Sequence, residues 1–487
     1  MKTGSQIIQA VNGTLWGVPM LVLLMGCGVY LTFALHAFQL TRARMWMRET
    51  FGSLFGKKNG HGNGISPYRA VSSALASSIG TGNIVGVATA IAAGGAGAVF
   101  WMWVSATFGM AIKYAEIFLA VKFRRKDKSG YYGGPMYYIE EGLGKGYKWL
   151  AAVFAFSGTL VCLGMGAMNQ SSSIAAVIQP YTHISKPVCG AILAIIAILA
   201  VSGGIARISS VTSALVPIMA GMYILGGIAI VCISPRAIYG AFCEIISSAI
   251  APCAIYGGAA GTAVRSAVRY GVARGVFSNE AGLGTSPIVH AAADAKSPVS
   301  QGLWGVFEVF VDTIVVCTVT AVVIIGSGTH LGEASGAGMV TLAFEKYFGH
   351  FGGVFVATAT VMFAISTILG WSYYGESCIG YLCGNRQSIA KVYRALFAAA
   401  VFLGAVMQAD AVWELADMFN GMMMVPNLIA VISLSGIVVK ETKTFLLTEN
   451  DKRSIIKSID KREKGKPGAR RKKTGSAAHN DAVRADT

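Results

Sequence analysis

The sequence predicts an all-α protein of about eleven membrane-spanning helices, and three of its features lead to this fold class. Of its 487 residues, 54% are hydrophobic and only 13% are charged, whereas soluble domains carry about 25% charged residues. The mean hydropathy is +0.58. Charge-free runs recur along the chain, and about 20 apolar residues suffice to cross a bilayer. Basic residues collect in alternate connections between these runs, which is the pattern that orients a membrane protein.

The expected spans follow the apolar runs in order, with an interruption in the seventh. They cover 14–38, 72–93, 97–121, 149–179, 187–204, 211–233, 254–293, 303–326, 351–377, 392–408 and 411–438. The segment 236–250 is expected to form a short interfacial or re-entrant helix. The first run is expected to remain as a helix, because no small-residue cleavage site ends it.

The distribution of basic residues predicts the topology. The connection 41–69 holds several Arg and Lys residues against a single acid, Glu49, and the connection 122–148 holds seven Lys and Arg residues, whereas the turn at 94–97 carries no charge. Placing the basic connections in the cytoplasm gives an outside N-terminus and a cytoplasmic C-terminus. The expected location is the plasma membrane, which in a bacterium is the inner membrane. The basic tail is expected to be disordered and to lie along the acidic membrane lipids of the inner leaflet.

Two glycine-rich interruptions are the most informative part of the chain. Residues 70–112 carry no charge, yet Ala76 to Gly86 reads ASSIGTGNIVG, and residues 271–287 read GVARGVFSNEAGLGTSP. Hydrocarbon tolerates broken backbone only where it faces protein or a water-filled cavity, so a broken helix at membrane depth indicates a binding site. Close packing of small residues between helices is the alternative interpretation.

The spacing of the two interruptions predicts the internal symmetry. They lie about five spans apart, which is the arrangement of an inverted five-plus-five repeat. The expected organisation is therefore an extra N-terminal helix with a basic loop (1–70), a first five-helix repeat (71–235), a second repeat (236–440) and the basic tail (441–487). Each half-helix exposes free N–H groups at its start, which suit a carboxylate, and free C=O groups at its end, which suit a small cation.

Several motifs at and around these interruptions resemble those of the sodium/alanine symporter family. They are GTGNIVGVATAI at 80–91, GGAGAVFWMW at 94–103, KYAE at 113–116, GGPMYY at 133–138 and GVFSNEAGLG at 275–284. The resemblance extends from about residue 10 to 440. It departs at Ala96, where the family usually has Pro. It implies the LeuT-like fold, with ten core helices in two inverted halves and one additional helix, here at the N-terminus.

The resemblance also implies a function and a set of site residues. The function would be import of small neutral amino acids, chiefly alanine and glycine, by sodium symport through alternating access. The residues expected to bind the amino acid are Thr81, Gly82, Asn83, Gln170, Phe277, Asn279 and Trp371. Those expected to bind the co-transported sodium ion are the carbonyls of Ala76 and Ile79 and the hydroxyls of Ser366 and Thr367.

Proton coupling, a channel and an enzyme are the alternative interpretations of the residues. A proton-coupled symporter on the same scaffold would need a titrating carboxylate such as Glu280 or Asp312, although an ion pair of Glu280 with Arg274 or another base is the favoured interpretation. A channel would need a continuous polar pore, and an enzyme would need a recognisable catalytic set. The net charge of +17 is not interleaved with exposed aromatic residues, so no nucleic acid is expected. No organic cofactor and no obligatory protein partner are expected either.

Overall fold

The computed structural model describes residues 11–13, 15–55, 64–127, 130–250, 259–407 and 409–447. The chain divides into two compact units, Met1–Val439 and Lys440–Thr487. The second unit is described as far as residue 447, where it is helical. The first unit contains the broken helices and every site residue that the sequence predicts.

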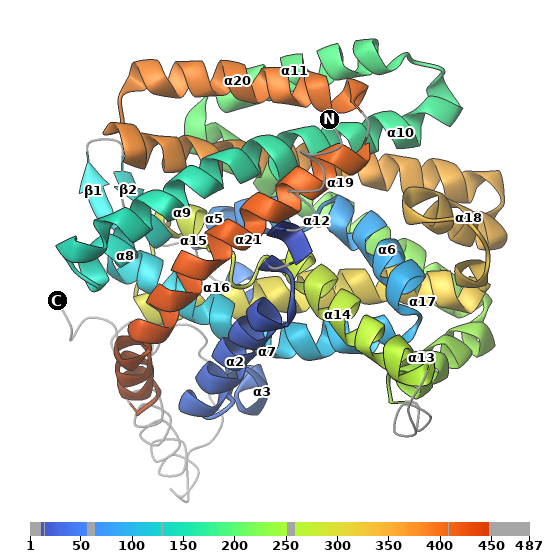
Figure 1. Ribbon diagram of the computed structural model, residues 1–487, viewed down its shortest axis with the longest axis horizontal. Helices are drawn as coiled ribbons and strands as arrows, with labels where there is room; N and C mark the ends of the chain where they lie inside the picture. Colours follow the sequence, from blue (N-terminus) through green and yellow to red (C-terminus); the bar gives the residue numbers. More distant parts are fainter. Residues whose placement is uncertain are drawn as a thin grey trace, which may run out of the picture. The chain divides into compact units, whose positions relative to one another are not determined.

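The first half of the chain is helical apart from one small hairpin (Figure 1). Its elements are α2 (Val18–Ala34), α3 (Phe38–Thr41), α4 (Ala43–Glu49), η1 (Phe51–Phe55), α5 (Pro67–Ser78), η2 (Thr81–Asn83), α6 (Val85–Gly94), α7 (Gly97–Lys122), β1 (Arg125–Asp127), β2 (Gly130–Tyr132), α8 (Pro135–Gly142), η3 (Lys145–Tyr147), α9 (Lys148–Val161), η4 (Cys162–Asn169), α10 (Gln170–Thr182), α11 (Lys186–Val201) and α12 (Gly204–Ile233). β1 and β2 pair antiparallel, with Lys126 opposite Tyr131.

The second half is also helical. Its elements are α13 (Pro235–Ala249), α14 (Ala259–Asn279), α15 (Ser286–Ala291), α16 (Pro298–Val309), η6 (Phe310–Cys317), α17 (Thr318–Ser327), η7 (Thr329–Leu331), α18 (Gly336–Phe348), α19 (His350–Cys383), α20 (Gln387–Val406) and α21 (Ala409–Ser433). Two of the segments, η4 and η6, are π-helical turns inside long helices. Such turns are rare and occur frequently at functional sites.

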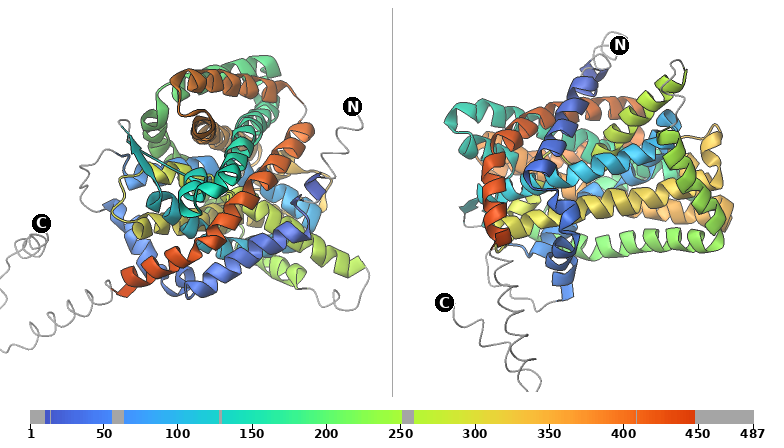
Figure 2. Two further views of the ribbon diagram at one scale, coloured as in Figure 1. Left: turned by 60° about the vertical axis from the view of Figure 1, so that its left-hand side comes forward. Right: turned by 90° about the horizontal axis from the view of Figure 1, so that it is seen from below.

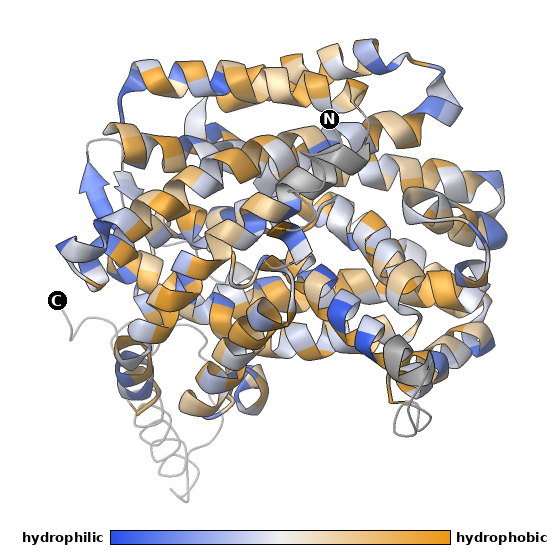
Figure 3. Ribbon diagram, viewed as in Figure 1, coloured by the Kyte–Doolittle hydropathy of each residue, from blue (hydrophilic) through white to orange (hydrophobic). Residues whose placement is uncertain are grey.

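The helices have the length and composition of membrane spans, which confirms the predicted all-α membrane fold. Within the described residues, seven helices are long and apolar enough to cross a bilayer, and two bent pairs raise the number to nine. Large apolar side chains face outward on several of them, for example Val22 on α2, Ile195 on α11 and Leu225 on α12. Hydrophobic residues dominate these ribbons (Figure 3). Contiguous apolar surface of this kind marks an interaction site on a soluble protein, and here it suits the surrounding lipid.

The first predicted interruption is a real break. The helix pair Pro67–Ser78 and Thr81–Gly94 is together long and apolar enough to form one span, but it bends by 57° at the break. α5 begins with a cap, in which the Ser66 hydroxyl accepts a hydrogen bond from the Arg69 amide and Pro67 occupies the first position. The second predicted interruption separates α14 from α15, with Glu280 at φ +57° and Gly282 and Gly284 also at positive φ. Glycine adopts this backbone conformation without steric cost.

The two broken helices pack against each other in opposite directions. α5 contacts α15, and α6 contacts α14, so the first half of one helix lies beside the second half of the other. An additional bridge joins Ile65 to Ala293, just before α5 and just after α15. This reciprocal packing is what an inverted repeat requires.

Two further helices, α7 and α19, pack around the broken pair. α7 packs along α14, α15 and α16, while α19 packs on α5, α9 and α12. The contact of α19 with α5 is so close that a Cβ added at Gly370 would lie 1.9 Å from the Ser77 Oγ. The N-terminal helix α2 contacts α7, α14 and α21 from outside this core, and the views in Figure 2 show it beside α21.

Candidate substrate and ion site

The first break frees backbone N–H and C=O groups, and side chains from other positions bond several of them. The last regular helical bond runs from the Ile79 amide to the Leu75 carbonyl. The Gly80 amide, which would bond Ala76 in a continuous helix, instead donates to the Asn83 Oδ1 at 2.9 Å. The Thr81 amide donates to the Gln170 Oε1 at 3.5 Å. The carbonyls of Ala76 and Ser77 are therefore available to partners from other helices.

The hydroxyl pair predicted to bind sodium contacts the freed carbonyl of Ala76. The Ser366 Oγ donates to it at 3.1 Å and the Thr367 Oγ1 at 3.2 Å. Both hydroxyls also reach back to the Phe363 carbonyl, at 2.7 and 3.0 Å. Ser366 and Thr367 are at most 1% exposed, and Ile79 is fully buried at the same break. Neutral oxygens brought together in this way are ligands that a small hard cation prefers.

Glycine is required at the point where the two helices approach. A Cβ on Gly80 would lie 2.5 Å from the Thr367 Oγ1 and 3.6 Å from the Gln170 Oε1. Any other residue would therefore push the hydroxyl of Thr367 out of place. The first break thus brings the predicted ion residues and the predicted substrate residue Gln170 to one point.

The predicted substrate residues around the start of η2 also meet. The Gln170 Oε1 accepts a hydrogen bond from the Thr81 hydroxyl at 3.1 Å, and its Nε2 donates to the Met165 carbonyl in the π-helical turn η4 at 3.2 Å. Phe277 of α14 lies against Gly82, because a Cβ on Gly82 would lie 3.6 Å from the Phe277 ring. Thr81, Gly82, Gln170 and Phe277 therefore form one contiguous, buried group.

Trp371 links the two breaks. Its indole N–H donates to the Ser77 carbonyl at 3.2 Å and to the Glu280 Oε1 at 3.1 Å. Thr285 donates to the second carboxylate oxygen of Glu280. The expected ion pair of Glu280 with Arg274 or another base is not found within the described residues, where no basic side chain lies within 4.0 Å of Glu280. Arg274 lies 3.8 Å from Asp417. The sequence could not show this, since Arg274 and Glu280 are close in the chain but the helix ends between them.

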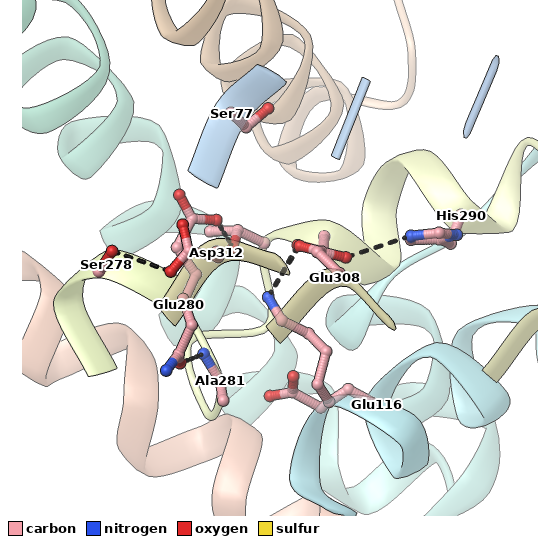
Figure 4. Close-up of polar contacts among 12 residues, drawn as sticks. Ser77, Glu116, Ser278, Glu280, Ala281, His290, Glu308 and Asp312 are labelled. Carbon is pink, nitrogen blue, oxygen red and sulfur yellow. Dashed lines mark hydrogen bonds and ion pairs between the residues drawn. The ribbon is translucent and has the colours of Figure 1, made fainter. Parts of the chain in front are cut away.

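The side-chain amide nitrogens of the two predicted asparagines bond to η6, while the Asn83 Oδ1 accepts from the Gly80 amide at the first break. The Asn83 Nδ2 donates to the Asp312 Oδ1 at 2.7 Å, and the Asn279 Nδ2 donates to the Thr313 hydroxyl at 3.1 Å. The other Asp312 oxygen accepts from Ser278 and Thr313, each at 2.9 Å; Figure 4 shows Ser278 and Asp312 together. Asp312 therefore joins the two broken helices, a role that the sequence did not predict. The sequence signal for this role was the position of Asp312, a carboxylate inside an apolar run.

A second buried network was also missed. Lys113 on α7 donates to the Ser286 hydroxyl at 2.8 Å and lies 3.4 Å from Glu308 on α16. His290 on α15 lies 3.4 Å from the other Glu308 oxygen and 2.7 Å from the Gln301 amide nitrogen. The side chains of Lys113, Glu308 and His290 are fully buried, and Figure 4 shows Glu308 reaching His290. This network fixes the second half of the second broken helix.

This arrangement defines a class of protein. Two interrupted helices meet inside a bundle of apolar spans, and side chains from at least three other helices hold the groups at their breaks. A buried polar site at a break in a membrane helix is the construction of a secondary transporter.

Comparison with known proteins gives the family. The sodium:alanine symporter family matches residues 1–458, and the chain belongs to this family of membrane transporters. It is 43% identical over 447 residues to the sodium/alanine symporter AgcS of Methanococcus maripaludis, covering 90% of this chain and 96% of that protein. An uncharacterized transporter of Haemophilus influenzae is 42% identical over 463 residues, covering 93% and 100%. A putative sodium/proton-dependent alanine carrier of Bacillus subtilis, YrbD, is 36% identical over 447 residues, covering 88% and 90%.

Proposed function

We propose that the protein imports small neutral amino acids, alanine and glycine above all, by sodium symport across the bacterial inner membrane. The N-terminus would lie outside and the C-terminus in the cytoplasm, as the basic connections predict. The observation that carries the proposal is the contact of Ser366 and Thr367 with the carbonyl that the first break sets free. The names of two relatives, which combine sodium with alanine, support it.

The amino acid would bind at the same break. Its carboxylate would meet the N–H groups of Thr81 and Gly82 at the start of the second half-helix, where the helix dipole favours an anion. Gln170 would contact the carboxylate from a third helix. Phe277 and Trp371 would limit the size of the side chain, while Asn83 and Asn279 would act indirectly by holding the two breaks on η6.

The ion would bind to the Ala76 and Ile79 carbonyls and to the hydroxyls of Ser366 and Thr367. Because these ligands come from α5 and α19, sodium binding would hold the two helices together before the site opens to the other side of the membrane. One charge crossing about 100 mV contributes roughly 2.3 kcal/mol, and a tenfold sodium gradient adds about 1.4 kcal/mol. Their sum of about 3.7 kcal/mol supports accumulation of a few hundred-fold.

Proton coupling on the same scaffold is the second candidate. It is favoured by two buried carboxylates, Glu280 and Asp312, each held by neutral donors. Among the described residues, neither carboxylate has a basic side chain within 4.0 Å. A carboxylate in such a place is costly to keep charged unless a cation or a proton accompanies it.

Counterflow uptake by the purified protein in liposomes tests the proposal. Liposomes are preloaded with unlabelled alanine, glycine, leucine or phenylalanine and diluted into labelled alanine. Sodium or choline is present on both sides of the membrane at a fixed pH. We expect alanine and glycine to exchange only with sodium, and leucine and phenylalanine not to exchange. Equal exchange in choline would favour the proton-coupled candidate, and strong exchange of leucine would contradict the proposed specificity.

A further inference from the structure

A groove of about 780 Å³ lies outside the transport site, between the N-terminal helix and the second broken helix. One face of α2 lines it with Val18, Leu21, Val22 and Met25, together with Gly17 just before the helix. This face opens to the outside of the molecule, because Val18 and Val22 are 59% and 64% exposed. At Gly13 an added Cβ would meet nothing within 4 Å, so the end of the groove is open as well.

The opposite wall combines charge with apolar surface. α14 contributes Arg265, Val268, Arg269 and Val272, whose spacing of three and four residues places them on one helical face. Both arginines are exposed. In the described part of the chain, no acidic side chain lies within 4.0 Å of either guanidinium group. Figure 3 shows hydrophilic turns on α14 among largely hydrophobic helices.

Trp101 at the start of α7 completes the lining. It packs on α14, since a Cβ on Gly271 would lie 2.7 Å from the Trp101 Cβ. Its indole N–H is buried and has no partner within the described residues. The groove therefore offers two cationic groups on α14, and aliphatic side chains along the rest.

We propose that this groove binds an anionic phospholipid of the surrounding bilayer. The headgroup phosphate would pair with Arg265 and Arg269, which suit a phosphate because guanidinium groups bind it through two hydrogen bonds. An acyl chain would lie along Val268, Val272 and the apolar face of α2. Basic pockets between membrane helices bind lipid headgroups in this way, and an arginine facing lipid is costly without such a partner.

A lipid bound in this groove would affect transport, because the groove lies on the second broken helix. α14 carries Phe277, Ser278 and Asn279 at its other end, and it packs on α6 and α7. A lipid bridging α2 and α14 would therefore stabilise one arrangement of the second broken helix. This inference is independent of which amino acid or ion the transporter carries.

Thermal unfolding of the purified full chain in detergent tests the inference. Phosphatidylglycerol, phosphatidylethanolamine and glycerol 1-phosphate are titrated separately. We compare the wild type with Arg265→Gln/Arg269→Gln, with Val22→Trp, which fills the groove but keeps both charges, and with Arg236→Gln. Arg236 is an exposed arginine on α13 outside the groove, so its variant is the matched control for loss of charge.

We expect phosphatidylglycerol to raise the unfolding temperature of the wild type and of Arg236→Gln more than phosphatidylethanolamine does. In the double variant, the concentration needed for half of this effect should rise at least about tenfold, as loss of charge-assisted contacts predicts. In Val22→Trp this concentration should also rise, because the larger side chain occupies the space of the acyl chain. An equal response of the double variant and the wild type would overturn the inference. Equal effects of the two lipids would also overturn it, and so would a full effect of glycerol 1-phosphate alone. A dimer of the protein that only Val22→Trp disrupts would likewise overturn it, because the groove would then hold a second copy of the chain.

Discussion

Removing the hydroxyl of Thr367 separates its proposed role in sodium binding from a role in packing. In the wild type the Thr367 Oγ1 lies 3.2 Å from the Ala76 carbonyl. In Thr367→Ala this carbonyl keeps the hydrogen bond from Ser366 at 3.1 Å, so it does not become an unsatisfied buried acceptor. We therefore expect the variant to fold, and its main defect to be the loss of one ion ligand.

The size of the defect follows from the number of ligands lost. One oxygen of a buried polar site in a membrane protein contributes about 1–2 kcal/mol. Because 1.4 kcal/mol is a factor of ten, the sodium concentration for half-maximal uptake should rise about five- to thirty-fold. At saturating sodium the affinity for alanine should largely recover, since the proposed substrate contacts lie on other residues.

The assay is the initial rate of labelled alanine uptake into liposomes across a sodium series at two pH values. Thr367→Ser, which keeps the hydroxyl, should resemble the wild type. Thr360→Ala is the matched control, because Thr360 is buried on the same helix and its hydroxyl bonds the Val356 carbonyl of its own helix at 2.8 Å. If the sodium curves of Thr367→Ala and the wild type superimpose, the proposed ion site is wrong.

Three further predictions concern the substrate and the buried charges. Gln170→Ala should lower alanine affinity about five- to thirty-fold for a loss of about 1–2 kcal/mol, and unchanged affinity in competition binding would assign Gln170 to helix packing. Trp371→Ala should admit larger amino acids in a competition panel, whereas continued exclusion of leucine by a folded variant would remove Trp371 from the pocket wall. Lys113→Met removes the ammonium group beside Glu308, whose remaining partners are Ser286 and His290, and should cost about 3–5 kcal/mol of stability, measured by thermal unfolding. The double variant Lys113→Met/Glu308→Gln should recover much of this loss, and no recovery would show that the two groups do not act as a pair.

The sequence predicted the backbone of the site well, because the signals are local. Glycines and small hydroxyl residues inside charge-free runs indicate a break directly, and both breaks are present. The hydroxyl pair and Gln170 were predicted through the family resemblance, and the geometry around Ala76 and Thr81 brings them to the first break.

The remaining features depend on tertiary packing. The direction of the Asn83 and Asn279 side chains is set by the position of η6, and nothing in their neighbouring residues encodes it. The π-helical turns at η4 and η6 follow no simple pattern, because one extra residue is accommodated within an otherwise continuous helix. The hairpin β1–β2 and the helix α18 lie in connections that the apolar pattern could not resolve. Lys113 and Glu308 are far apart in sequence, so their pairing becomes visible only in the fold.

The most direct test of the account is accumulation of alanine against its own gradient in liposomes. Purified protein is reconstituted, the pH is clamped, and an inward sodium gradient is imposed together with an inside-negative potential. We predict a transient accumulation of alanine well above equilibrium, which disappears when choline replaces sodium. In Thr367→Ala this accumulation should require a higher sodium concentration. Equal accumulation in choline, or accumulation that follows an imposed proton gradient and ignores sodium, would contradict the account.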